Sequence, residues 1–242
     1  ERNNPVLEEI VLDLSPKDVK MFNGLTLIVV QHLQKNTIDF IKLLSQAGFR
    51  EIILVAKSYS VNDKACFEIK KHSKVLLPNS IVETKTLIKN EISALIASKN
   101  KFVAMDLGGD IGKTLNNYPK AAIDKLCVGV VEDTKNGLHW LEGGTKLKFP
   151  LVSIASSFLK DGVESYFVAR SVARNLENLF VNVFSTDLVN RKVLVVGYGP
   201  IGKNIALALK RLNCIVDVND IDPLAKIMAV VDGFNTVPEK DK

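Results

Sequence analysis

A glycine-rich turn between two apolar segments constrains this chain more than any other stretch. The apolar residues 193–196 run directly into the pattern Gly-x-Gly-x-x-Gly formed by Gly197, Gly199 and Gly202. An apolar helical stretch follows at once, and the next candidate strand, residues 214–220, ends in acid. A strand, a turn, a helix and a second strand in this order are the setting in which such glycines bind a dinucleotide.

The glycines of this turn have separate physical tasks. Gly197 permits the tight turn, Gly199 lets a pyrophosphate approach the backbone because it has no Cβ, and Gly202 allows close packing of helix and strand. Pro200 and Ile201 lie at the helix start, where free backbone N–H groups attract phosphate. We therefore predict that NAD binds here. The alternative is an ordinary glycine-containing turn without a ligand.

An acidic residue at the end of the second strand indicates which dinucleotide is bound. Asp220 lies 18 residues after Gly202, at the expected end of that strand. A carboxylate there accepts hydrogen bonds from the ribose diol and repels a 2′-phosphate, so NAD is favoured over NADP. Asp217 and Asp222 are the competing candidates, the first in mid-strand and the second one step into the loop.

Composition narrows the classes of function. The chain has 242 residues, 47% hydrophobic and 24% charged, which is typical of a globular protein. The net charge is +5, but the basic residues are scattered, so we expect no nucleic-acid partner. The three cysteines are far apart, which suits a reducing cytoplasm and indicates neither disulfides nor a metal site. No signal peptide and no apolar run of about 18 residues is visible, so no membrane association is expected.

Strand-like and helix-like segments alternate along most of the chain, which predicts an α/β fold with mostly parallel sheets and helices on both faces. We expect two doubly wound domains of this kind. The expected strands are residues 25–30, 51–56, 75–77, 102–105, 127–131, 151–154, 193–196 and 214–220. The expected helices are residues 37–47, 63–71, 82–97, 119–125, 159–184 and 224–231.

The expected domain boundary follows the long amphipathic helix at residues 159–184. A short polar passage comes next, so we place a substrate-binding domain at residues 1–185 and a Rossmann-type NAD-binding domain at residues 186–242. The second domain has room for about half of the usual six strands, and we expect it to be only partly present. Residues 5–14 read as strand or loop.

Several stretches, taken in order, resemble the S-adenosylhomocysteine hydrolase (adenosylhomocysteinase) family. These are Gln31-His32-Leu33, residues 106–110, 129–137, 148–150, 159–165, 195–203 and 220–223. The resemblance implies a cytoplasmic homo-oligomer of one-carbon metabolism that hydrolyses a small nucleoside thioether. It also implies a retained NAD that oxidises the ribose 3′-hydroxyl and later returns the hydride.

The resemblance also assigns roles to individual residues. His32 matches the histidine near the 5′ leaving group, and Lys160 matches the lysine that handles the 3′-hydroxyl proton. Glu164 stands where the family has aspartate, one helical turn beyond Lys160. Asp133 matches the acid that reads the adenine amino group. Thr134 matches a threonine on the cofactor side.

Each assignment has a purely structural alternative. A histidine at a strand end is often only a satisfied polar residue. A Lys–Glu pair at i, i+4 on a helix can be an ordinary surface ion pair. The acids Glu132 and Asp133 can simply favour the start of a helix.

Four positions depart from the family pattern. Leu107, Ala155 and Ser165 stand where the family has aspartate, asparagine and asparagine, and Gln34 replaces a threonine. Three readings therefore stay open. The chain is an adenosylhomocysteinase-type enzyme, an inactive homologue that binds NAD or a nucleoside as a regulatory module, or an NAD-dependent dehydrogenase of a 2-hydroxy or amino acid.

Overall fold

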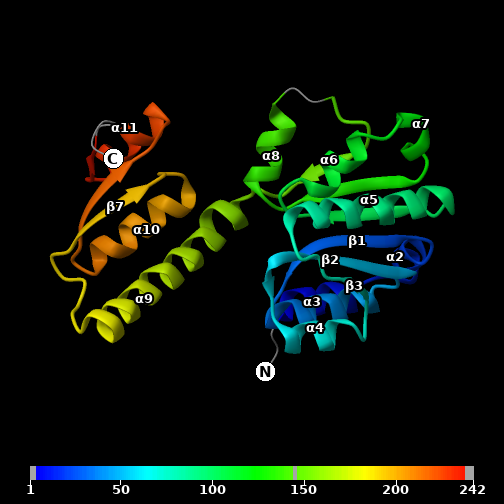
Figure 1. The fold of residues 1–242 in the computed structure, drawn as a ribbon, viewed down its shortest axis with the longest axis horizontal. Coiled ribbons are helices and arrows are strands. Elements are labelled where there is room, and N and C mark those ends of the chain that lie inside the picture. The colour runs from blue at the N-terminus through cyan, green and yellow to red at the C-terminus, as the bar shows by residue number, and fades with distance from the viewer. Residues whose placement is uncertain (1–3, 144–145, 238–242) are drawn as a thin grey trace. The chain divides into compact units, whose positions relative to one another are not determined.

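The computed structural model describes residues 4–143 and 146–237, which divide into two compact units (Figure 1). The first unit comprises Glu1–Ala155 and the second Ser156–Lys242. This boundary differs from the expected one after residue 185. The reason is that the long helix α9 (Ser165–Phe184) packs against helix α10 (Pro200–Arg211) and so belongs to the second unit.

The first unit is built on a six-stranded sheet in the order β3-β2-β1-β4-β5-β6. Every neighbouring pair is parallel, as the sequence predicts. The order reverses between β1 and β4, and ligands of open α/β sheets bind beyond the carboxyl ends of the strands at such a point. The strands are β1 (Thr26–Leu33), β2 (Glu51–Val61), β3 (Lys74–Leu76), β4 (Phe102–Asp106), β5 (Cys127–Glu132) and β6 (Leu151–Ser153).

Helices cover both faces of this sheet, because alternate residues of its central strand are apolar on both sides. Ile28 and Val30 pack with α5, α6 and α7, whereas Leu27 and Val29 pack with α3 and α4 on the opposite face (Figure 1). The doubly wound arrangement predicted for this unit is therefore confirmed. The helices are α3 (Lys35–Gln46), α4 (Asp63–Ile69), α5 (Ile81–Ala97), α6 (Asp110–Asn116), α7 (Lys120–Ile123) and α8 (Lys135–Glu142).

The first described residues are helical, so the strand or loop expected at residues 5–14 is wrong. Helix α1 (Pro5–Leu12) begins with proline and has an acid in its first turn, both of which favour a helix start. Helix α2 (Pro16–Phe22) follows with a capping box between Ser15 and Asp18. Neither helix buries a residue, so neither segment needs the periodic apolar residues by which a helix is recognised in a sequence.

The second unit holds three parallel strands in the order β7-β8-β9, which are β7 (Lys192–Val196), β8 (Ile215–Asn219) and β9 (Asn235–Thr236). Its core joins β7 and β8 to α9, α10 and α11 (Pro223–Val231). Val195 lies in that core, but Leu194 and Val196 on the other side of β7 are 43% and 71% exposed. Within the described residues, helices therefore cover one face of this sheet and not two.

Candidate functional site

The predicted NAD turn lies where β7 passes into α10. Gly197 has φ +96°, a left-handed value that favours glycine. Its N–H donates to the Asn219 carbonyl at 2.7 Å, which fixes the turn to β8. A Cβ on Gly202 would overlap the carbonyl oxygen of Gly197, so only glycine allows the helix to sit this close to the turn.

The turn leaves open space in front of Gly199. A Cβ built on Gly199 would meet nothing within 4 Å, so its backbone is directly accessible to a ligand. Pro200 occupies the first turn of α10, and the first N–H bonded within the helix is that of Lys203, to Gly199. The N–H groups of Ile201 and Gly202 are therefore left for an external acceptor. The geometry fits a pyrophosphate.

Asp220 directly follows β8 and lies beside the glycine turn. One carboxylate oxygen accepts the N–H of Tyr198 at 2.5 Å, and the other accepts the N–H of Asp222 at 2.8 Å. The hydrogen bonds from Asp222 and then Tyr198 lower the pKa of Asp220. Asp222 itself caps α11 by accepting the N–H of Leu224, and Asp217 lies within β8. Of the three acids, Asp220 is the one bound to the turn.

The glycine turn is also held through Tyr198 to the residue that follows α11, which the sequence did not reveal. The Tyr198 side chain is buried against Phe234, and its hydroxyl donates to Asp232 at 2.9 Å. Lys203 forms an ion pair with the same Asp232 oxygen at 2.7 Å. Burial, followed by the Asp232 carboxylate, raises the pKa of Tyr198. The tyrosine inside the glycine motif therefore holds α10 to the end of α11.

Lys160 and Glu164 also lie in the second unit, in the π-helical segment η1 (Leu159–Glu164) that precedes α9. Their side chains form an ion pair at 2.5 Å, with the lysine side chain 20% exposed and the glutamate 50% exposed. Short π-helical segments inside helices occur frequently at functional sites. Ser165, the first residue of α9, directly follows this segment, and its hydroxyl donates to the Asp161 carbonyl and accepts from Asn204 of α10.

His32 lies at the carboxyl end of β1, in the first unit. It faces a hollow of about 500 Å³ whose other lining side chains are all uncharged. Burial first, and then the nearby Lys57 cation, lowers the pKa of His32, so the imidazole is neutral at neutral pH. Its Nδ1 is buried and has no hydrogen-bond partner within the described chain. A neutral imidazole with a free nitrogen can accept or pass on a proton.

Lys57 and Asp110 form a charged pair near His32 that the sequence did not reveal. Lys57 Nζ lies 2.7 Å from the Asp110 carboxylate, and both side chains are nearly buried. The two residues are 53 positions apart, on β2 and at the start of α6. Helix α6 itself was not predicted, because seven residues after two glycines show too little periodicity.

Glu132 has a structural task at the end of β5. Its carboxylate accepts the N–H groups of Gly108 and Gly109 at 3.1 and 2.9 Å. The same carboxylate accepts the N–H and hydroxyl of Thr134 at 2.8 and 2.6 Å. A Cβ on Gly137 would overlap it, so the glycine at that position is required. Glu132 therefore fixes the loop after β4 and the start of α8.

Asp133 and Thr134, two further predicted site residues, adjoin this carboxylate. The N–H of Asp133 donates to the Asp106 carbonyl at 3.1 Å. The Thr134 hydroxyl accepts from Gly137 and so caps α8. Their predicted contacts with adenine and with the cofactor side stay predictions.

Asp106 is a buried carboxyl at the end of β4. It accepts the N–H groups of Leu107 and Gly112 at 2.9 and 2.8 Å. Burial is the main cause that raises its pKa to about 6, and the Glu132 charge adds to this effect. The neighbouring Leu107, which replaces a family acid, packs against the core instead.

The predicted site residues thus fall into two groups. In the first unit, His32 lies at the end of β1, and Asp133 and Thr134 follow β5. Lys160, Glu164, the glycine turn and Asp220 belong to the second unit. In the part of the chain that is described, no group of three His, Cys, Asp or Glu side chains could hold a metal ion. No helix of that part is both long and apolar enough to cross a membrane.

Most of the second unit matches a protein family whose cofactor is known. Residues 182–241 match the profile of the S-adenosyl-L-homocysteine hydrolase NAD-binding domain. NAD, the cofactor predicted from the glycine motif, is thereby confirmed.

Two named relatives match along nearly the whole chain. An adenosylhomocysteinase from Thermotoga maritima is 26% identical over an alignment of 243 residues, which covers 99% of this chain and 58% of the relative. One from Saccharolobus solfataricus is 25% identical over 242 residues, which cover 98% of this chain and 56% of the relative. The chain therefore spans little more than half the length of these relatives.

Two solved structures align with most of this chain. A dipicolinate synthase from Bacillus halodurans gives a TM-score of 0.46 at 12% identity, over 90% of this chain and 69% of that chain. A putative D-3-phosphoglycerate dehydrogenase from Ralstonia solanacearum gives a TM-score of 0.41 at 13% identity, over 90% of this chain and 61% of that chain.

Proposed function

We propose that this chain, a divergent member of the adenosylhomocysteinase family, takes part in hydrolysis of S-adenosylhomocysteine or a related nucleoside thioether through transient oxidation of the ribose 3′-hydroxyl. The observation that carries the proposal is the open backbone at Gly199, beside a helix start and the Asp220 carboxylate. NAD bound at this turn would accept the hydride from the ribose and later return it. The backbone N–H groups of Ile201 and Gly202 would hold its pyrophosphate, and Asp220 would hold the ribose diol.

The remaining steps are proton transfers by residues of this chain. Lys160 in its neutral form takes the proton of the 3′-hydroxyl and so becomes the ammonium that Glu164 holds in the 2.5 Å ion pair. The neutral imidazole of His32 accepts a proton at one ring nitrogen and gives one from the other to the leaving thiolate at the 5′ position. Asp133 accepts a hydrogen bond from the adenine amino group. These roles follow from the match of each residue to the family motifs.

An inactive NAD-binding homologue is the second candidate. Three positions favour it, because the family has aspartate or asparagine there and this chain has side chains that only pack or support the fold. Leu107 packs against the core, Ala155 is buried, and Ser165 binds Asp161 and Asn204. None of these three side chains can transfer a proton in its observed setting.

A turnover assay separates the two candidates. The protein is incubated with S-adenosylhomocysteine, and adenosine and free thiol are measured. The proposal predicts both products, with activity lost in Lys160→Ala and kept in Lys125→Ala, an exposed lysine outside these motifs. Absence of both products, together with bound NAD that adenosine cannot reduce, supports the inactive homologue. Net release of NADH with a 2-hydroxy acid indicates a dehydrogenase instead.

A further inference from the structure

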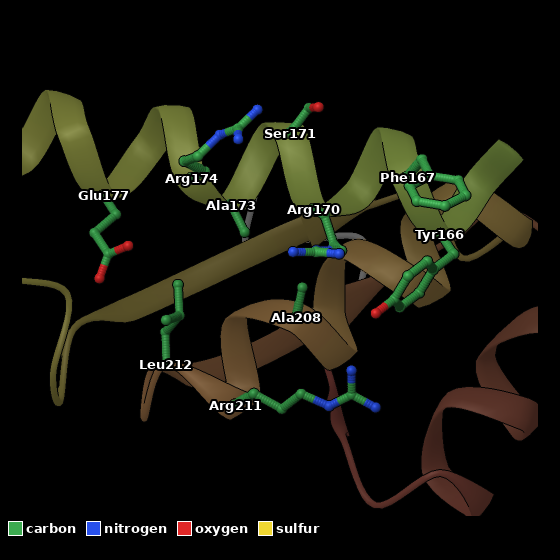
Figure 2. A pocket seen from close by; sticks show the side chains of 10 residues that line it. All are labelled: Tyr166, Phe167, Arg170, Ser171, Ala173, Arg174, Glu177, Ala208, Arg211 and Leu212. Atoms are coloured by element: carbon green, nitrogen blue, oxygen red, sulfur yellow. The ribbon is translucent and has the colours of Figure 1, made fainter.

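A groove between α9 and α10 carries three arginines that the proposed hydrolysis does not use. The groove lies within the second unit and encloses about 550 Å³, a size typical of small-molecule sites (Figure 2). Arg170 and Arg174 come from α9, and Arg211 is the last residue of α10. Two alanines, Ala173 and Ala208, also line it, where the helices run side by side.

The spacing along α9 explains why the groove has this chemistry. Tyr166, Arg170 and Arg174 follow at intervals of four, so they lie along one face of the helix. Figure 2 shows Arg170 pointing from α9 toward α10, with Tyr166 near it and Arg211 on the α10 side. The groove therefore has guanidinium groups on both walls and an aromatic ring at one end.

The charges of the groove are not balanced by the protein. Glu177 is the single carboxylate among its lining residues, against three guanidiniums. Among the described residues, none of the three arginines has an ion pair or hydrogen bond, and Arg170 only lies over the Tyr166 ring at 5.9 Å. Each guanidinium offers five N–H donors in a planar fork that matches phosphate oxygens.

We propose that this groove binds a nucleoside polyphosphate, with the phosphates on Arg170 and Arg211 and the base against the exposed rings of Tyr166 and Phe167. The net positive lining selects the anionic end, and the aromatic wall selects a ligand that also has a flat ring. The groove follows the later turns of α10, whereas the glycine turn precedes its first residue. The site is therefore separate from the NAD turn, and the inference goes beyond the proposed hydrolysis.

The test uses ATP as the probe and NAD-saturated protein, so that the glycine turn is already filled. Isothermal titration calorimetry should detect ATP binding that weakens as salt is added. The double variant Arg170→Gln/Arg211→Gln should weaken it by about tenfold or more, because two charge-assisted contacts are lost. The double variant Lys85→Gln/Lys125→Gln removes the same charge from exposed sites of the first unit, and it should bind ATP normally.

A third variant tests the aromatic wall. Tyr166→Ala should weaken binding of ATP but leave binding of inorganic tripolyphosphate unchanged. Thermal unfolding and NAD retention serve as folding controls, since all the substituted side chains are exposed. The proposal is overturned if NAD saturation abolishes ATP binding, if the arginine variant binds ATP like the wild type, or if the lysine variant loses as much affinity.

Discussion

Substitution of two glycines in the same turn should give different results, with Gly199→Ala weakening cofactor binding and Gly202→Ala lowering stability. Gly199 has φ −68° and ψ −177°, which alanine adopts without strain, and its Cβ would meet no protein atom within 4 Å. The Cβ of Gly202→Ala would instead overlap the Gly197 carbonyl. The two variants therefore separate the binding role of the turn from its structural role.

The expected magnitudes follow from these contacts. Gly199→Ala should leave the free energy of unfolding unchanged or raise it by up to about 1 kcal/mol, because alanine fits this conformation and has fewer unfolded conformations than glycine. Gly202→Ala should lower it by about 1–3 kcal/mol, as for an overpacked contact. In Gly199→Ala the methyl group excludes the pyrophosphate from the helix start. A lost charged hydrogen bond of about 1.5–3 kcal/mol corresponds to roughly tenfold to hundredfold weaker NAD binding.

Two measurements decide this prediction. Urea unfolding without cofactor gives the stability of each variant, and isothermal titration calorimetry with NAD gives its affinity. Wild-type NAD affinity in Gly199→Ala would refute the reasoning, because the pyrophosphate would then lie elsewhere. Wild-type stability in Gly202→Ala would refute the close packing of α10 on the turn.

Three further predictions concern the rest of the molecule. The raised pKa of Asp106, about 6 against 3.8, means that the folded state keeps its proton longer than the unfolded state, so stability falls as pH rises between these values. Between these two pH values the free energy of unfolding of the wild type should fall by about 3 kcal/mol relative to that of Asp106→Asn, measured by urea unfolding. The same pH dependence of stability in both proteins would contradict this. Glu132→Gln leaves a backbone N–H facing an amide NH₂ and should lower the free energy of unfolding by about 1–3 kcal/mol, whereas the exposed Glu177→Gln should not. Tyr198→Phe removes the bond to Asp232 and should cost about 1 kcal/mol in the same assay; an unchanged stability would show that this bond is not needed.

The sheets were predictable because their signal is local. Apolar runs at residues 25–30 and 51–56 match the first parts of β1 and β2, which continue to Leu33 and Val61, and the glycine turn falls between β7 and α10 as expected. Parallel strands buried on both faces read as continuous apolar runs, so they are visible without any knowledge of their partners.

The features that were missed depend on partners distant in sequence. Glu132 was considered only as an acid that can favour a helix start, but two of its hydrogen bonds come from Gly108 and Gly109, more than twenty positions away. Lys57 gave no signal at all, because its partner Asp110 lies on another element. The division of the structure after Ala155 differs from the expected boundary because α9 packs on α10, a contact that the amphipathic pattern of α9 does not identify.

The most direct test of the central claim is the redox state of cofactor that stays on the protein. The protein is purified without added NAD, adenosine is supplied, and the absorbance of NADH is followed before and after gel filtration. If the turn retains a redox cofactor, dinucleotide copurifies with the chain, adenosine reduces it, and the NADH remains with the protein. Copurified NAD that adenosine does not reduce, or NADH that leaves with the small molecules, would contradict a retained redox cofactor at the Gly197–Gly202 turn.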